Sequence, residues 1–214
     1  PILPIDSGRY GSREMREIFD DKRRLQYQLD FEAAVAAAQA RIKMIPQDAA
    51  QEIGRVARSG KVTLARVAEL EAASEHDTAA IVEALSEQVP SSARPWVHYG
   101  LTSNDVVDTA TCMQMRDAFS IIEAKVAKLA SLLSGRAVEY RDLPAVGRTH
   151  GQHASIISFG LKFAVWAAEM ARHIERIEEG KKRFLLCKTR GVVGTGSLMG
   201  ERATEVEKAV ASAL

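Results

Sequence analysis

The chain has few cysteines, and their positions exclude two common kinds of site. Cys112 and Cys187 lie far apart in the sequence and neither belongs to a CxxC motif. Structural zinc sites and the disulfide frameworks of small secreted domains need closely spaced or numerous cysteines. We therefore predict neither, and we expect a reducing, cytoplasmic environment.

The sequence also lacks a long apolar run and a strong net charge. No stretch approaches the roughly 20 apolar residues of a membrane-spanning helix, and the first residues, PILPIDSGRYG, do not resemble a signal peptide. Lys and Arg number 29 against 28 Asp and Glu, which gives a net charge of +1. Without a strong overall field, we expect a soluble protein that binds neither nucleic acid nor membranes.

Alternating strand patterns are nearly absent, and Ala, Glu, Arg, Leu and Lys dominate most windows. These residues favour helices, so we predict an all-α chain. A helix is expected to begin at Ser12, whose side chain can cap it, and to continue until Pro46. Further helices are expected over residues 47–58, 63–73, 76–89 and 104–141, after the histidine stretch at 147–154, and over the final RATEVEKAVASAL.

The two central helices are expected to be unusually long. Residues 104–141 contain no proline and one glycine, Gly135. The next helix carries an apolar seam spaced by four and three residues, formed by Ile156, Gly160, Phe163, Ala167, Met170, Ile174 and Ile177. A helix of about 57 Å exceeds a compact domain of this size, so it needs neighbours from beyond Leu214, from other subunits, or from both.

We therefore predict two parts, a domain of short helices over residues 1–110 and the first part of a long-helix bundle domain over 111–214. The chain ends within an amphipathic helix without a glycine cap, and we expect it to be truncated.

The segment GRTHGQHA contains two histidines, His150 and His153, between a proline and a long helix. Two histidines with HxxH spacing can bind a metal. Here, however, a glycine lies between them, no Glu stands beside the first histidine, and the sequence offers no obvious third ligand. We predict no metal site, and a surface turn is the simplest alternative. His173, among charged residues of the following helix, is expected to be solvated.

Three other segments combine charged and hydroxyl side chains at expected helix starts, where free backbone N–H groups attract anions. They are SGRYGS at 7–12, EHD at 75–77 and HYGLTSND at 98–105. Each alone is ordinary capping. Together they predict several anion-binding helix ends. GVVGTGS, which begins at Gly191, lacks the ending of a phosphate-binding P-loop.

The order of RY, HD, HYGLTSND and GRTHGQHA resembles the adenylosuccinate lyase family of the fumarase/aspartase superfamily, over the whole chain. The resemblance implies cleavage of adenylosuccinate to AMP and fumarate, and the related cleavage of succinylaminoimidazole carboxamide ribotide in purine biosynthesis. It also implies a homotetramer with a central helical bundle, active sites shared by three subunits, and no metal or organic cofactor.

By position, the resemblance implies two catalytic residues. His150 matches the general acid, a role that suits a histidine because its pKa lies near the working pH, and His76 orients the substrate. The implied substrate-binding residues are Arg9 and Tyr10 for the nucleotide, Asp77 for the phosphate end, Thr102 and Ser103 for the succinyl portion, Thr149 for a carboxylate, and His98. His153 matches no catalytic position.

Two departures from the family pattern limit these expectations. Glu75 stands before the HD pair, where a basic residue is common. The serine loop of the form SSxMPxKxNP, which supplies the general base in the family, is not found in these residues, so we expect the chain alone not to complete turnover. The alternatives are argininosuccinate lyase or carboxymuconate cycloisomerase in the same superfamily, or a helical assembly module without chemistry.

Overall fold

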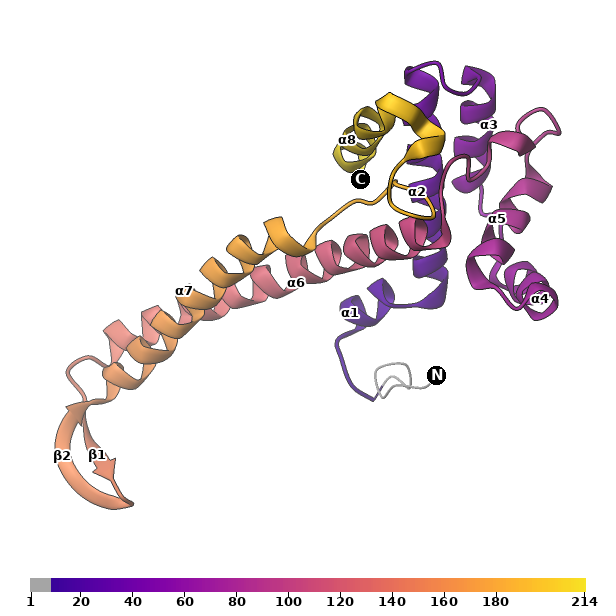
Figure 1. The fold of residues 1–214 in the computed structure, drawn as a ribbon. Helices are drawn as coiled ribbons and strands as arrows, with labels where there is room; N and C mark the ends of the chain where they lie inside the picture. The colour runs from indigo at the N-terminus through magenta and orange to yellow at the C-terminus, as the bar shows by residue number, and fades with distance from the viewer. Residues whose placement is uncertain (1–8) are drawn as a thin grey trace. The chain divides into compact units, whose positions relative to one another are not determined.

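The computed structural model describes residues 9–214, which form eight α-helices, two 3-10 helices and one β-hairpin. Their order along the chain can be followed in Figure 1. The helices are α1 (Arg13–Ile18), α2 (Asp21–Arg41), α3 (Gln47–Ala57), α4 (Leu64–Ser74), α5 (Asp77–Gln88), η1 (Arg94–Trp96), α6 (Ser103–Glu139), α7 (Phe159–Phe184), η2 (Ser197–Arg202) and α8 (Ala203–Ala213). The all-α prediction is confirmed, and within the described part of the chain no helix combines the length and apolarity needed to cross a membrane.

The chain divides into two compact units. Unit 1 comprises the described residues up to Asp117 together with Leu185–Leu214, and unit 2 comprises Ala118–Phe184. Helix α6 contributes to both units. The predicted boundary between residues 110 and 111 concerns the domains of the whole protein and stays a prediction.

Several helices of unit 1 begin where the sequence predicts, because a polar side chain caps each start. The Ser12 hydroxyl accepts a hydrogen bond from the Met15 backbone N–H at 3.3 Å. The Thr63 hydroxyl caps α4 in the same way. The single helix predicted between Ser12 and Pro46 is wrong, since Asp20 caps a new helix by accepting from the Lys22 N–H at 2.9 Å.

The core of unit 1 is built around α2, which packs against α3 and α8. Phe31 is fully buried, and Ile53 of α3 and Leu85 of α5 are at most 1% exposed. Burying side chains of this size is the main stabilising contribution to such a unit. Helix α2 therefore lies at the centre of unit 1, and three of its polar residues, Gln28, Glu32 and Gln39, are buried with it.

Unit 2 contains an antiparallel hairpin that the sequence did not predict. Strand β1 (Pro144–Thr149) pairs with β2 (Gln152–Ser158), with an irregularity between Val146 and Arg148. Both strands are largely exposed, so they lack the alternation of buried and polar residues by which a strand is recognised. The seam helix consequently begins at Phe159, and Ile156 lies in β2, 79% exposed.

Within unit 2, α6 and α7 lie side by side in antiparallel directions (Figure 1). Near one end, the Phe119 and Phe184 rings have centroids 4.7 Å apart, and Lys181 Nζ lies 2.5 Å from the Glu123 carboxylate. Near the other end, the Tyr140 and Phe163 rings are 5.8 Å apart. The hairpin joins the two helices at this second end.

Candidate active site

Arg9 and Tyr10 lie on the surface just before α1. The Arg9 guanidinium stands 5.5 Å from the centroid of the Tyr10 ring, and Tyr10 is 55% exposed. A guanidinium near an aromatic face presents a cation beside a flat apolar surface. The pair therefore offers the chemistry expected of a contact to an anionic, ring-containing ligand.

His76 is the N-cap of α5, and it caps the helix with one of its ring nitrogens. Its Nδ1 accepts a hydrogen bond from the Ala79 N–H at 3.3 Å and lies 3.5 Å from the Asp77 carboxylate. Because Nδ1 accepts, the proton of the neutral ring lies on Nε2. Asp77 accepts from the Thr78 N–H at 2.6 Å. Both side chains are about half exposed, so each remains accessible to a ligand.

The residue before them, Glu75, occupies the left-handed backbone region with a φ of 54°. It is the C-cap of α4, and its N–H donates to the Glu71 carbonyl at 2.8 Å. Glu75 is exposed. Glu75, at the position where a basic residue is common in the family, therefore lies at an exposed helix end that accommodates its carboxylate.

His98 is held by a buried carboxylate of α2. The distance between His98 Nδ1 and Glu32 Oε1 is 2.6 Å, and the Glu32 side chain is 1% exposed. Burial lowers the pKa of the His98 imidazole, but the hydrogen bond and charge of Glu32, with the charge of Asp105, outweigh it and raise that pKa above its ordinary value of 6.5. The protonated ring is thus favoured up to a higher pH than in an ordinary histidine.

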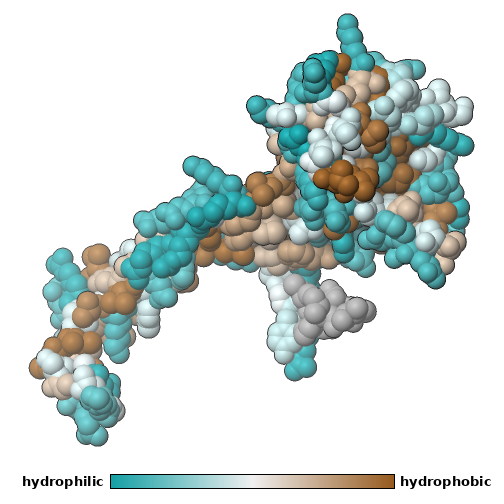
Figure 2. All heavy atoms as spheres, viewed as in Figure 1, coloured by the Kyte–Doolittle hydropathy of each residue, from teal (hydrophilic) through white to brown (hydrophobic). Residues whose placement is uncertain are grey.

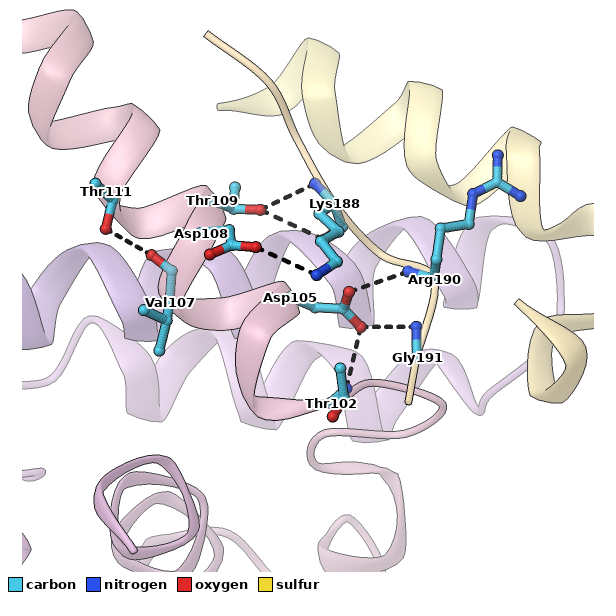
Figure 3. A network of polar contacts seen from close by, with 9 residues as sticks. All are labelled: Thr102, Asp105, Val107, Asp108, Thr109, Thr111, Lys188, Arg190 and Gly191. Carbon is cyan, nitrogen blue, oxygen red and sulfur yellow. Dashed lines mark hydrogen bonds and ion pairs between the residues drawn. The ribbon is translucent and has the colours of Figure 1, made fainter. Parts of the chain in front are cut away.

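Thr102 and Ser103 stand at the start of α6, half-buried, where the first backbone N–H groups of a helix are unpaired. The Thr102 N–H donates to the Asp105 carboxylate at 3.0 Å. This carboxylate is fully buried, and it also accepts from the backbone N–H groups of Arg190 at 3.2 Å and Gly191 at 2.8 Å (Figure 3). Asp105 therefore fixes the start of α6 against the segment that precedes η2.

Thr149 and His150 lie at the tip of the hairpin in unit 2. Thr149 pairs with Gln152, which leaves His150 and Gly151 as a two-residue loop with φ values of 50° and 72°. Two consecutive positive φ values are typical of the tight turns that suit twisted hairpins. The His150 side chain is exposed, as expected of a group that meets a ligand. His153 pairs with Arg148 along the ladder.

The predicted site residues thus fall into two groups. Those of unit 1 are Arg9, Tyr10, His76, Asp77, His98, Thr102 and Ser103, and those of unit 2 are Thr149 and His150. The motifs indicate no role for Glu32, and Asp105 lies in HYGLTSND without an assigned role. The signal for Glu32 is an acid within the alanine-rich run FEAAVAAAQA, where a charge needs a buried partner.

A family model described as Lyase matches residues 8–214. The chain belongs to this lyase family. The match covers all four motifs on which the resemblance rested, and the predicted membership of the fumarase/aspartase superfamily is confirmed at the level of the family.

The chain is 44% identical to the adenylosuccinate lyase of Methanocaldococcus jannaschii over 213 residues, which is 100% of the chain and 46% of the relative. It is 44% identical to the adenylosuccinate lyase of Pyrococcus horikoshii over 98% of the chain and 46% of the relative. The crystal structure of the 3-carboxy-cis,cis-muconate lactonizing enzyme of Pseudomonas putida is similar with a TM-score of 0.87 and 36% identity, over 94% of this chain and 47% of that one. The chain spans about half the length of the curated relatives it matches.

Proposed function

We propose that the whole protein is an adenylosuccinate lyase, of which this chain carries the N-terminal portion. The observation that carries the proposal is the 44% identity to adenylosuccinate lyases over the entire chain, including the four motif segments. The reaction is the β-elimination of fumarate from adenylosuccinate, which leaves AMP, and from succinylaminoimidazole carboxamide ribotide in purine biosynthesis.

In this elimination a base removes a proton from the carbon beside a carboxylate, and the electron pair left there forms the double bond of fumarate. The C–N bond breaks, and an acid delivers a proton to the departing purine-side nitrogen. We assign the acid to His150, which stands exposed in the hairpin turn. The general base belongs to a part of the whole protein beyond Leu214.

The intermediate carries two negative charges, so donors and cations must surround it. We assign this role to the start of α6, where Thr102 and Ser103 supply hydroxyl groups and the helix supplies N–H groups, and to Thr149. Arg9 and Tyr10 hold the nucleotide, and His76 with Asp77 orients its phosphate end. No organic cofactor or metal is needed for this chemistry.

We further propose that the protein is a cytoplasmic homotetramer whose active sites combine segments of different subunits. Unit 2 supports this proposal, since it exposes large apolar side chains along α6, α7 and the hairpin (Figure 2). They include Leu132 at 58%, Val138 at 67%, Val165 at 56% and Trp166 at 48%. Exposed apolar surface of this kind is typical of a surface that a partner covers.

The test is turnover by the full-length protein, followed as the loss of adenylosuccinate absorbance. His150→Gln removes the acid but keeps the size of the side chain, and general acid catalysis contributes about 10²–10⁴-fold. We expect turnover to fall by that factor while the oligomeric state, measured by light scattering, is unchanged. The matched control is His153→Gln, three residues along the same hairpin, which should retain activity within about twofold of the parent, as a surface substitution does.

Three outcomes contradict the proposal. The 36% identity to the lactonizing enzyme keeps a different lyase of the superfamily as the second candidate. Turnover of argininosuccinate or carboxymuconate, with none of adenylosuccinate, would favour that candidate. Turnover of adenylosuccinate that His150→Gln barely alters would exclude His150 as the acid, and the absence of all these activities would leave a helical assembly module.

A further inference from the structure

Glu32 is a buried acid in the middle of α2 that the proposed mechanism does not use. The whole residue is 2% exposed, and its sequence neighbours Phe31 and Ala33 belong to the core. Burying a carboxylate among apolar side chains is costly unless a charged or hydrogen-bonding partner compensates it. Glu32 has such a partner in His98, at 2.6 Å and 66 positions along the chain.

A second buried polar side chain of α2 holds the next residue of the same loop. Gln39 is fully buried, and its Nε2 donates to the Tyr99 carbonyl at 2.8 Å. Glu32 and Gln39 are seven residues apart, about two helical turns, so they lie on one face of α2. One helix face therefore fixes His98 by its ring and Tyr99 by its backbone.

The backbone of His98 also needs this support. Its φ of 59° places it in the left-handed region, which histidine adopts more often than most residues but at some cost. The segment that follows leads directly to Thr102 and the start of α6. His98 thus lies four residues before Thr102, the first of the donors that we assign to the succinyl portion of the substrate.

We propose that Glu32 is a positioning residue, whose buried carboxylate accepts Nδ1–H of His98 and so leaves Nε2–H of a cationic ring to bind a carboxylate of the substrate. This inference rests on the proposed function. Because the chain has a net charge of only +1, its overall charge does not attract an anionic substrate. The protonated His98 ring would supply a local positive charge.

The electrostatic surroundings of His98 determine the pH dependence that follows. The charged groups that act on the ring are Glu32 on α2 and Asp105 on α6, and both favour protonation, whereas burial opposes it. With the pKa of His98 raised, the cation persists to a higher pH than in an ordinary histidine and is lost as the pH rises through the raised value. Without the Glu32 charge, burial prevails and the cation is lost at lower pH.

The experiment is a double-mutant cycle in the full-length protein, with Glu32→Gln, His98→Gln and the combination. Glu32→Gln keeps the shape and one acceptor but removes the charge. We expect kcat/KM to fall about 10- to 100-fold near pH 8, because the ring without its charged partner is largely neutral there, with a smaller loss near pH 6. In the His98→Gln background the same change should alter kcat/KM less than about twofold, because a residue that acts through another has no separate effect.

The matched control is Glu52→Gln on α3, whose carboxylate pairs with Arg55 on the surface. It should leave the pH profile unchanged. An unshifted profile for Glu32→Gln, or equal losses in the presence and absence of His98, would overturn the inference. Thermal unfolding of each variant separates these results from a loss of folded protein.

A readout independent of turnover distinguishes this inference from the proposed function. The ring Cε1–H resonance of His98, identified by its absence in His98→Gln, gives the pKa directly by NMR titration. We expect Glu32→Gln to lower that pKa by at least one unit. If the parent protein does not cleave adenylosuccinate, the proposed function fails and the substrate role fails with it, whereas an unchanged pKa in an active enzyme overturns the positioning role alone.

Discussion

Replacing Asp105 by Asn tests how the start of α6 is held, because its fully buried carboxylate accepts three backbone hydrogen bonds. One oxygen accepts from Arg190, and the other accepts from Thr102 and Gly191. An amide keeps only one acceptor oxygen. In the better orientation it leaves the Arg190 N–H unsatisfied, at a cost of about 1–3 kcal/mol.

The two remaining bonds then lose their ionic character, which costs about 1 kcal/mol each, since bonds to charged groups contribute more than neutral ones. The smaller desolvation cost of an amide offsets part of this loss. We expect Asp105→Asn to lower the free energy of unfolding by about 2–4 kcal/mol, measured by urea denaturation followed by circular dichroism. Hydrogen exchange of the Arg190 and Gly191 amides should accelerate as well.

Asp108→Asn provides the control from the same helix. Asp108 is 56% exposed at its side chain and forms an ion pair with Lys188 at 3.2 Å, so its replacement should cost about 0–1 kcal/mol. Figure 3 shows both acids facing the same segment of chain. If Asp105→Asn costs no more than Asp108→Asn, the three hydrogen bonds do not stabilise this junction as we argue.

Two further predictions concern a close contact between helices and a buried hydrogen bond. A Cβ at Gly160 would lie 2.4 Å from the Ala137 carbonyl oxygen, whereas one at Gly135 would meet nothing within 4 Å. We therefore expect Gly160→Ala to lower the melting temperature and Gly135→Ala to raise the free energy of unfolding by about 0.5–1 kcal/mol. Equal effects of the two substitutions would refute the close approach of the two helices. Tyr27→Phe removes a 2.5 Å hydrogen bond from a buried hydroxyl to Asp117 and should cost about 1.5–3 kcal/mol in urea denaturation. Burial raises the pKa of Asp117, but its hydrogen bonds outweigh burial, and the net effect lowers that pKa. The stabilisation by this bond should therefore be present above the ordinary pKa of 3.8 and be lost as the pH falls below 3.8. A cost of Tyr27→Phe that does not depend on pH in that range would argue against the bond.

The sequence predicted the features that local chemistry determines. Ser12, Thr63 and His76 were expected at helix starts, and each caps a helix through its own side chain. The same rule applied to Asp20 would have divided the first helix, since Asp is a favoured cap. The break at Asp20 is not evident from the pattern, because helix-forming residues dominate on both sides of it.

The hairpin and the buried contacts of the site could not be predicted in this way. Strands β1 and β2 bury little, so their sequence carries no alternation. The contact of Glu32 with His98 joins residues 66 positions apart, and that of Asp105 with Arg190 joins residues 85 apart. Such pairs depend on the tertiary fold, and the motifs could indicate only one member of each pair.

His98 and His150, to which we assign substrate binding and general acid catalysis, differ in how much of their environment this chain determines. His98 has its ring nitrogen, its backbone and its charge determined by α2 within unit 1. His150 has a defined backbone in a tight turn, but its side chain is exposed to solvent. A general acid works best in a site from which water is excluded. Unit 1 therefore determines the environment of His98 by itself, whereas the role that we propose for His150 requires further protein surface to cover the hairpin.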